Sequence, residues 1–207
     1  MKKINFCLFV LSLAISANAV WAGAVEITPF VGYMFNSGLD VTSADYSRLR
    51  VDGGTDYGFT VGTYFGNNIS LEFMFNRQNS GLSVESTDQQ ILNLSINQYD
   101  VNFLYNWGTS ESTTRPYVLF GLGSTHFNPH VNDLDLSGLN KFNLGLGAGV
   151  KTYFGKHFGL RGEFRYTPTY LNTTDDGFFC DAFGCYVVSE VNRLHQVDIT
   201  AGTIFRF

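Results

Sequence analysis

The stretch FNLGLGAGVKTYF, residues 142–154, alternates apolar residues with glycine or polar residues almost without interruption. Its apolar positions are Phe142, Leu144, Leu146, Ala148, Val150 and Phe154, and between them lie Asn143, Gly145, Gly147, Gly149, Lys151 and Tyr153. A β-strand turns successive side chains to opposite faces. This stretch therefore predicts a strand with one face in apolar surroundings and the other toward a polar interior.

Seven further segments of about ten residues show the same alternation, which is typical of strands that cross an outer membrane. Their apolar faces lie within residues 25–35, 57–65, 69–75, 99–107, 118–122, 158–170 and 197–207. The least regular facing is that of residues 117–123. Together, the eight segments predict an all-β fold, an eight-stranded antiparallel up-and-down transmembrane β-barrel.

The connections between these segments alternate in length, which indicates which end of the barrel faces out. Gly66-Asn67-Asn68 and Gly155-Lys156-His157 are short, and residues 108–115 are of modest length. The remaining connections, residues 36–55, 79–93, 128–140 and 172–193, are long. Outer-membrane barrels have short periplasmic turns and longer external loops. We therefore expect four external loops.

The N-terminus has the features of a secretory signal peptide. Lys2 and Lys3 precede an apolar run from Phe6 to Ile15, and small residues follow, with cleavage expected after Ala22. Residues 1–22 are thus the predicted signal peptide and residues 23–207 one barrel domain. The mature part would carry 11 basic and 18 acidic residues, a net charge of −7. Such a charge disfavours nucleic acid as a partner.

Charged residues recur on the polar faces of the predicted strands. They are Glu26, Asp56, Glu72, Asp100, Lys151, Arg161, Glu163, Arg165, Asp198 and Arg206. An eight-stranded barrel is just wide enough for its own side chains, and buried charges require partners. We expect a packed ion network in the lumen, with Glu72 and Lys151 or Arg161 as a leading pair; the alternative is a gated pore or proton path.

Three pieces of the sequence, residues 64–72, 115–123 and 155–166, resemble the OmpA/OmpX-type outer-membrane β-barrel superfamily, which includes opacity-like surface proteins. The resemblance implies residence in the outer membrane of a Gram-negative bacterium, among outer-membrane lipids and lipopolysaccharide. It also implies an assembly signal for the outer-membrane assembly machinery, carried here by Ile199, Phe205 and Phe207. Members include adhesins, surface antigens, structural anchors and a few lipid A-modifying enzymes.

An enzymatic role is the sharper alternative. Barrel-type lipid A deacylases carry a His-x-Ser motif on a late strand, and the matching positions here are Arg165 and Thr167. Arginine stays protonated and is not a general base. Ser124-Thr125-His126 is the local candidate for palmitoyl transfer near a rim. We expect neither catalytic residues nor a cofactor. We favour an envelope-structural or adhesion role through the external loops, with a host or extracellular ligand as the candidate partner.

The fourth predicted loop is the most unusual. Cys180 and Cys185 form an even pair in an exported chain, which predicts a local disulfide. Around them lie the aromatic residues Phe178, Phe179, Phe183 and Tyr186. They would form a preorganised recognition surface or pack on the loop's own stem.

A metal site is the last alternative. His126 and His130 lie near Asp133 and Asp135, but Pro129 interrupts any helix that would align the two histidines. Two Asp-Gly stretches, residues 52–56 and 175–177, could bind calcium weakly but are more typical of turns. We therefore predict no metal site.

Overall fold

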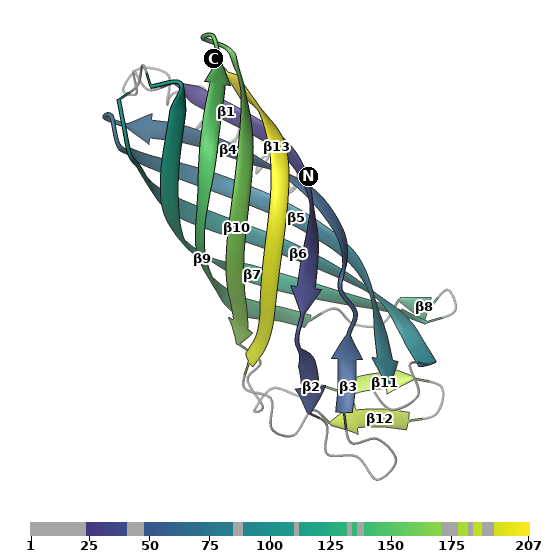
Figure 1. Cartoon of the computed structure of the whole chain (residues 1–207). Helices are drawn as coiled ribbons and strands as arrows, with labels where there is room; N and C mark the ends of the chain where they lie inside the picture. The colour runs from purple at the N-terminus through teal and green to yellow at the C-terminus, as the bar shows by residue number, and fades with distance from the viewer. Residues whose placement is uncertain are drawn as a thin grey trace, which may run out of the picture.

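The computed structural model describes residues 24–40, 48–84, 89–109, 112–131, 134–135, 139–170, 178–181, 184–187 and 193–207. Its main feature is a ring of antiparallel strands in which chain neighbours are also neighbours in space (Figure 1). The ring comprises β1 (Val25–Asn36), β4 (Gly54–Phe65), β5 (Ile69–Val84), β6 (Gln89–Asn106), β7 (Thr114–Val131), β9 (Leu139–Phe154), β10 (Phe158–Tyr170) and β13 (Arg193–Arg206). Pairing of β1 with β13 closes it. The predicted eight-stranded antiparallel barrel is confirmed.

Side chains alternate between the lumen and the outer surface as the sequence pattern predicts. On β1, Glu26 and Thr28 are 3% and 1% exposed, whereas Val31 is 66% exposed. On β7, the strand with the least regular pattern, Tyr117 is buried and Val118 is exposed. An outer surface of exposed Val, Leu, Ile, Phe and Tyr around a polar interior suits a wall surrounded by lipid. Within the described residues, the chain has no helix long and apolar enough to cross a bilayer.

The short turns and the C-terminus lie at one end of the barrel, as Figure 1 shows. Gly66 and Gly155 begin the two short turns with φ of 72° and 86°, a left-handed conformation that glycine adopts without strain. Phe207 and Val25 are joined there by backbone hydrogen bonds of 3.1 and 2.9 Å. By the rule of short periplasmic turns, this end faces the periplasm.

Additional short strands lie at the opposite, external end (Figure 1). They are β2 (Gly38–Asp40), β3 (Arg48–Val51), β8 (Leu134–Asp135), β11 (Phe178–Asp181) and β12 (Gly184–Val187). β2 and β3 form a hairpin that continues the wall beside β5, and β8 pairs with β7. β11 and β12 form a separate two-stranded hairpin.

The strands extend further toward the external end than the sequence predicts. Residues 79–84 and 89–93 are paired in the β5–β6 ladder, and β7 continues to Val131. The expectation that residues 79–93 and 128–140 are loops is therefore wrong for most of their length. These segments are rich in Asn and Ser, so they lack the apolar alternation that marks a strand in contact with lipid.

Candidate functional site: the ion network in the lumen

The periplasmic half of the lumen is filled by one hydrogen-bonded network of polar side chains. Every strand of the ring contributes to it. Its members are Glu26 on β1, Thr60 and Tyr64 on β4, Glu72 on β5, Asp100 and Asn102 on β6, Tyr117 on β7, Lys151 and Tyr153 on β9, Arg161, Glu163 and Arg165 on β10, and Arg206 on β13. The network thus ties the eight strands together from inside.

Lys151 is the centre of the first half of this network. It is 1% exposed, and its Nζ lies 2.9 Å from Glu26 Oε2 and 2.9 Å from Glu72 Oε1. Arg206 Nε lies 3.3 Å from the other oxygen of Glu26. Because a buried ammonium without partners is costly, the two carboxylates are what allow a lysine here. Lys151 in turn joins β9 to β1 and β5 across the barrel.

The second half of the network is a series of ion pairs between charged residues of β10 and carboxylates of β5, β6 and β10. Arg161 donates to Glu72 Oε2 at 2.7 Å and to Glu163 Oε2 at 2.5 Å. Arg165 donates to Glu163 Oε1 at 2.9 Å and lies 3.7 Å from Asp100 Oδ2. The planar guanidinium groups hold two acceptors at once, a geometry that a lysine would not reproduce.

Three inward tyrosines, Tyr64, Tyr117 and Tyr153, complete the network, and none of them was predicted to belong to it. Tyr117 Oη donates to Glu163 at 2.6 Å and accepts from Arg161 Nε at 2.7 Å. Tyr153 donates to Glu26 at 2.7 Å. The Tyr117 ring lies over the backbone of Gly149, where any Cβ would collide with it. The alternation pattern does place these tyrosines on the polar face, which is the signal that could have identified them.

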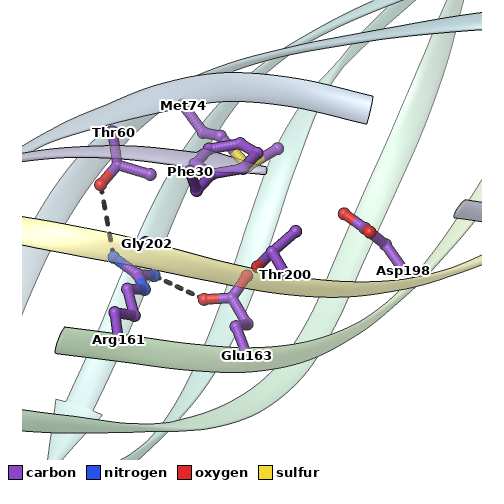
Figure 2. Close-up of a pocket in the computed structure, with 8 residues that line it drawn as sticks. All are labelled: Phe30, Thr60, Met74, Arg161, Glu163, Asp198, Thr200 and Gly202. Carbon is purple, nitrogen blue, oxygen red and sulfur yellow. Dashed lines mark hydrogen bonds and ion pairs between the residues drawn. The ribbon is translucent and has the colours of Figure 1, made fainter. Parts of the chain in front are cut away.

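Asp198 is the predicted network member whose surroundings differ from those of the others. It is 3% exposed, and no ion pair joins it to the described residues. Figure 2 shows its carboxylate apart from the bonded Arg161 and Glu163. Asp198 lies nearer the external end of β13, opposite Met34 on β1 and Arg165 on β10. Asp198 therefore lies beside the ion network without an ion pair of its own, and its membership of the network stays a prediction.

Uncharged polar residues fill the lumen on the external side of Asp198. Gln98 donates to Gln196 at 3.0 Å, and Thr169 donates to the same oxygen at 3.1 Å. Asn143 donates to Thr125 at 2.9 Å. The lumen therefore changes from charged to neutral along its axis.

The residues considered for catalysis are divided between the two faces. Arg165 and Thr167 are both buried in the lumen, where Arg165 is held by carboxylates. On β7, Thr125 is buried and hydrogen-bonded inside, whereas His126 contacts Asn140 Oδ1 through Nδ1 at 2.7 Å on the exposed side. Ser124, the serine of this candidate, is two residues from His126 on β7 and therefore lies on the same face as His126.

The candidate recognition residues lie at the external end. Phe178, Phe179 and Tyr186 belong to the β11–β12 hairpin, and Phe183 lies outside the described residues. Cys180 is the direct cross-strand partner of Cys185. Directly opposite residues in an antiparallel pair have their Cα atoms close enough for a disulfide. The register of the hairpin is therefore compatible with a Cys180–Cys185 disulfide, and the bond itself stays a prediction.

The candidate assembly signal runs along β13 from its middle to the periplasmic end. Ile199 and Phe207 are 52% and 75% exposed on the outer surface, and Phe205 packs edge to face with Phe158 at 5.6 Å between ring centroids.

A closed antiparallel barrel with an apolar outer wall and a packed polar lumen defines an integral outer-membrane protein. The family model of the outer membrane protein beta-barrel domain matches residues 6–186. The chain belongs to this family and resides in the outer membrane of a Gram-negative bacterium. A search of curated proteins gave no match.

Solved structures share the fold at low sequence identity. The chain is similar to Neisserial surface protein A (14% identity, 89% of this chain and 99% of that chain covered, TM-score 0.64). OprG from Pseudomonas aeruginosa gives 15% identity, coverage of 90% and 97%, and a TM-score of 0.64. Ail of Yersinia pestis was solved in complex with the heparin analogue sucrose octasulfate. It gives 14% identity, coverage of 89% of this chain and 99% of that chain, and a TM-score of 0.50.

Proposed function

We propose that this protein is a surface-recognition barrel, which uses a plugged transmembrane part to hold an external binding platform. The observation that carries the proposal is the network around Lys151 and Arg161, in which side chains from all strands of the ring meet inside the lumen. A fixed plug of paired charges supports a structural role for the membrane part and disfavours conduction.

The length of the external strands supports the second half of the proposal. β6 and β7 are 18 residues long, whereas about 9–11 residues suffice to cross a membrane. Short turns fix the periplasmic end, so the surplus extends outward. Paired strands present side chains at lower entropic cost than flexible loops do. The platform is defined by the external parts of β5, β6 and β7 with the β2–β3 and β11–β12 hairpins.

The charge of the platform restricts its ligand. The external connections contain the acids Asp40, Asp45, Asp52, Glu85, Asp88, Asp133, Asp135, Asp175, Asp176, Asp181 and Glu190, against the bases Arg48, Arg50 and Arg193. Sulfated saccharides such as the one in the Ail structure are polyanions, and like charges repel them here. We therefore favour a protein ligand with basic patches, such as an extracellular-matrix protein.

The test uses intact cells of a non-adherent host that export the full chain. We expect these cells to bind surfaces coated with a matrix protein that carries basic patches more than vector-only cells do, and not to bind heparin. Replacement of residues 178–187 by a Gly-Ser segment of equal length should abolish the binding, and the same replacement of residues 155–157, on the periplasmic side, should not.

Purified protein in planar bilayers provides the second arm of this experiment. The plugged lumen predicts no steady single-channel steps. Binding to no coated surface, or steady conductance of nanosiemens size, would contradict the proposal and favour a pore.

A further inference from the structure

The outer face of the wall carries two basic residues at the external end of β13. Arg193 and His195 are exposed, whereas Leu194 and Gln196 are each 1% exposed and face the lumen. Arg193 lies opposite Tyr170, the last residue of β10. Figure 1 shows these ends of β10 and β13 side by side at the external end of the barrel. Two basic side chains therefore project outward from the wall at this rim.

Both side chains are held against tyrosines of β10. The Arg193 guanidinium carbon lies 5.0 Å from the centroid of the Tyr170 ring. The His195 ring stacks on Tyr166 with 5.9 Å between the ring centroids, and Tyr166 Oη lies 2.6 Å from His195 Nδ1. The backbone of His195 is also hydrogen-bonded to Ser37, which follows β1. These contacts restrict the two side chains in advance, which lowers the entropic cost of binding a ligand.

Neither basic side chain is paired with an acid of the described structure. The ion pairs among the described residues include neither Arg193 nor His195. The acids of β10 and β13, Glu163 and Asp198, are buried on the lumen side. Arginine is always charged and has five N–H donors, and a tyrosine that donates to Nδ1 of a histidine leaves the hydrogen on Nε2. The rim therefore presents positive charge and hydrogen-bond donors that suit an anion.

The depth of the two residues along the wall decides which anion they meet. A strand crosses the hydrocarbon core of a membrane in about 9–11 residues, and β10 has 13 residues. Counted from Phe158 beside the periplasmic turn, the crossing ends near residues 166–168. Tyr170 and Arg193 then lie just beyond the hydrocarbon, in the belt where membrane proteins carry aromatic and basic anchors. Arg193 and His195 therefore face the lipid headgroups of the outer leaflet.

The wall between this rim and the periplasmic end suits acyl chains. Leu160, Phe164 and Ile199 are each 52% exposed on the outer face of β10 and β13, and Phe164 lies directly opposite Ile199. An amphiphile with its anionic group at Arg193 would lay its chains along these apolar side chains. The same face thus matches both parts of a negatively charged lipid.

We propose that Arg193 and His195, held by Tyr170 and Tyr166, bind a phosphate group of lipid A in the outer leaflet. A guanidinium holds a phosphate through two parallel hydrogen bonds, and basic residues at the membrane surface attract anionic headgroups. The site faces the membrane and not the external platform, so it does not depend on the ligand proposed for that platform.

The experiment uses the full mature chain, refolded in detergent without lipopolysaccharide. Native mass spectrometry after addition of bisphosphorylated lipid A should show a lipid-bound chain. The double variant Arg193→Gln/His195→Gln should weaken this binding by about tenfold or more, because each basic residue at an anionic lipid surface contributes about fivefold. Arg193→Lys keeps the charge and loses the planar fork, so its binding should fall between that of the wild type and that of the double variant.

The matched control removes the same two residue types from the other end of the barrel. Lys156→Gln/His157→Gln changes exposed positions in the periplasmic turn between β9 and β10, and it should bind lipid A as the wild type does. Far-UV circular dichroism checks that both double variants are folded. Equal binding by the two double variants would overturn the proposal, because the basic residues of the external rim would then have no particular role.

The choice of lipid separates the phosphate from the acyl chains. Lipid A from which both phosphates have been removed should bind the wild-type chain about tenfold or more weakly than bisphosphorylated lipid A does. Equal binding of the dephosphorylated lipid would overturn the proposal, since the acyl chains alone would then account for it. Equal binding of phosphatidylglycerol would also overturn it, because the rim would then accept any anionic lipid.

Discussion

A Lys151→Met barrel is expected to lose about 3–5 kcal/mol of its free energy of unfolding, because removing one partner of a buried ion pair leaves the other charge uncompensated. Here two carboxylates lose their shared partner, since Glu26 and Glu72 each lie 2.9 Å from Lys151 Nζ. Methionine has nearly the same length as lysine, so the loss reports on charge more than on packing. The measurement is equilibrium urea unfolding in lipid vesicles.

The matched control is Lys156→Met in the β9–β10 turn, where the lysine is exposed. It should change the free energy of unfolding by less than about 0.5 kcal/mol. Equal effects at both positions would show that the network around Lys151 does not hold the wall together.

A charge on the outer wall should have the second largest effect. Phe120 is 44% exposed and lies on the outer face of β7 between Phe103 and Leu146 of the adjacent strands. We expect Phe120→Arg to lower the free energy of unfolding in vesicles by about 2–4 kcal/mol, the cost of arginine near the bilayer midplane.

The same substitution at a rim is its control. Phe158 begins β10 directly after a periplasmic turn and is 55% exposed. Phe158→Arg should cost only about 0–1 kcal/mol, since arginine near the interface reaches water and headgroups. A cost at position 120 no larger than that at position 158 would contradict a lipid-facing wall.

The facing of each strand is predictable from sequence because strand geometry converts alternation directly into two faces. Asn143 and Lys151 on β9 lie inside, and Phe142 and Val150 lie outside, as the FNLGLGAGVKTYF pattern indicates. The external ends were harder to predict, because strands above the membrane have water on the outside and need no apolar face. The polar external part of β5 illustrates this limit of the pattern.

The pairing of charges in the lumen depends on quantities that a single sequence does not contain. Lys151 meets Glu26 across 125 positions of sequence, and Arg161 meets Glu72 across 89. Which residues meet is set by the stagger between strands around the closed ring. The same stagger places Asp198 opposite Arg165 but without an ion pair to any described cation, whereas Glu163 forms ion pairs with two arginines. Two acids that look alike in sequence therefore have different surroundings.

Quenching of a single tryptophan by brominated lipid tests the central claim, that lipid contacts the apolar face of this barrel. The mature chain from Gly23 with Trp107→Phe and Phe120→Trp carries one tryptophan, on the outer face of β7. In vesicles with bromine on the acyl chains, the account predicts strong quenching of its fluorescence. Emission that is unchanged by bromination in correctly folded protein would contradict the account.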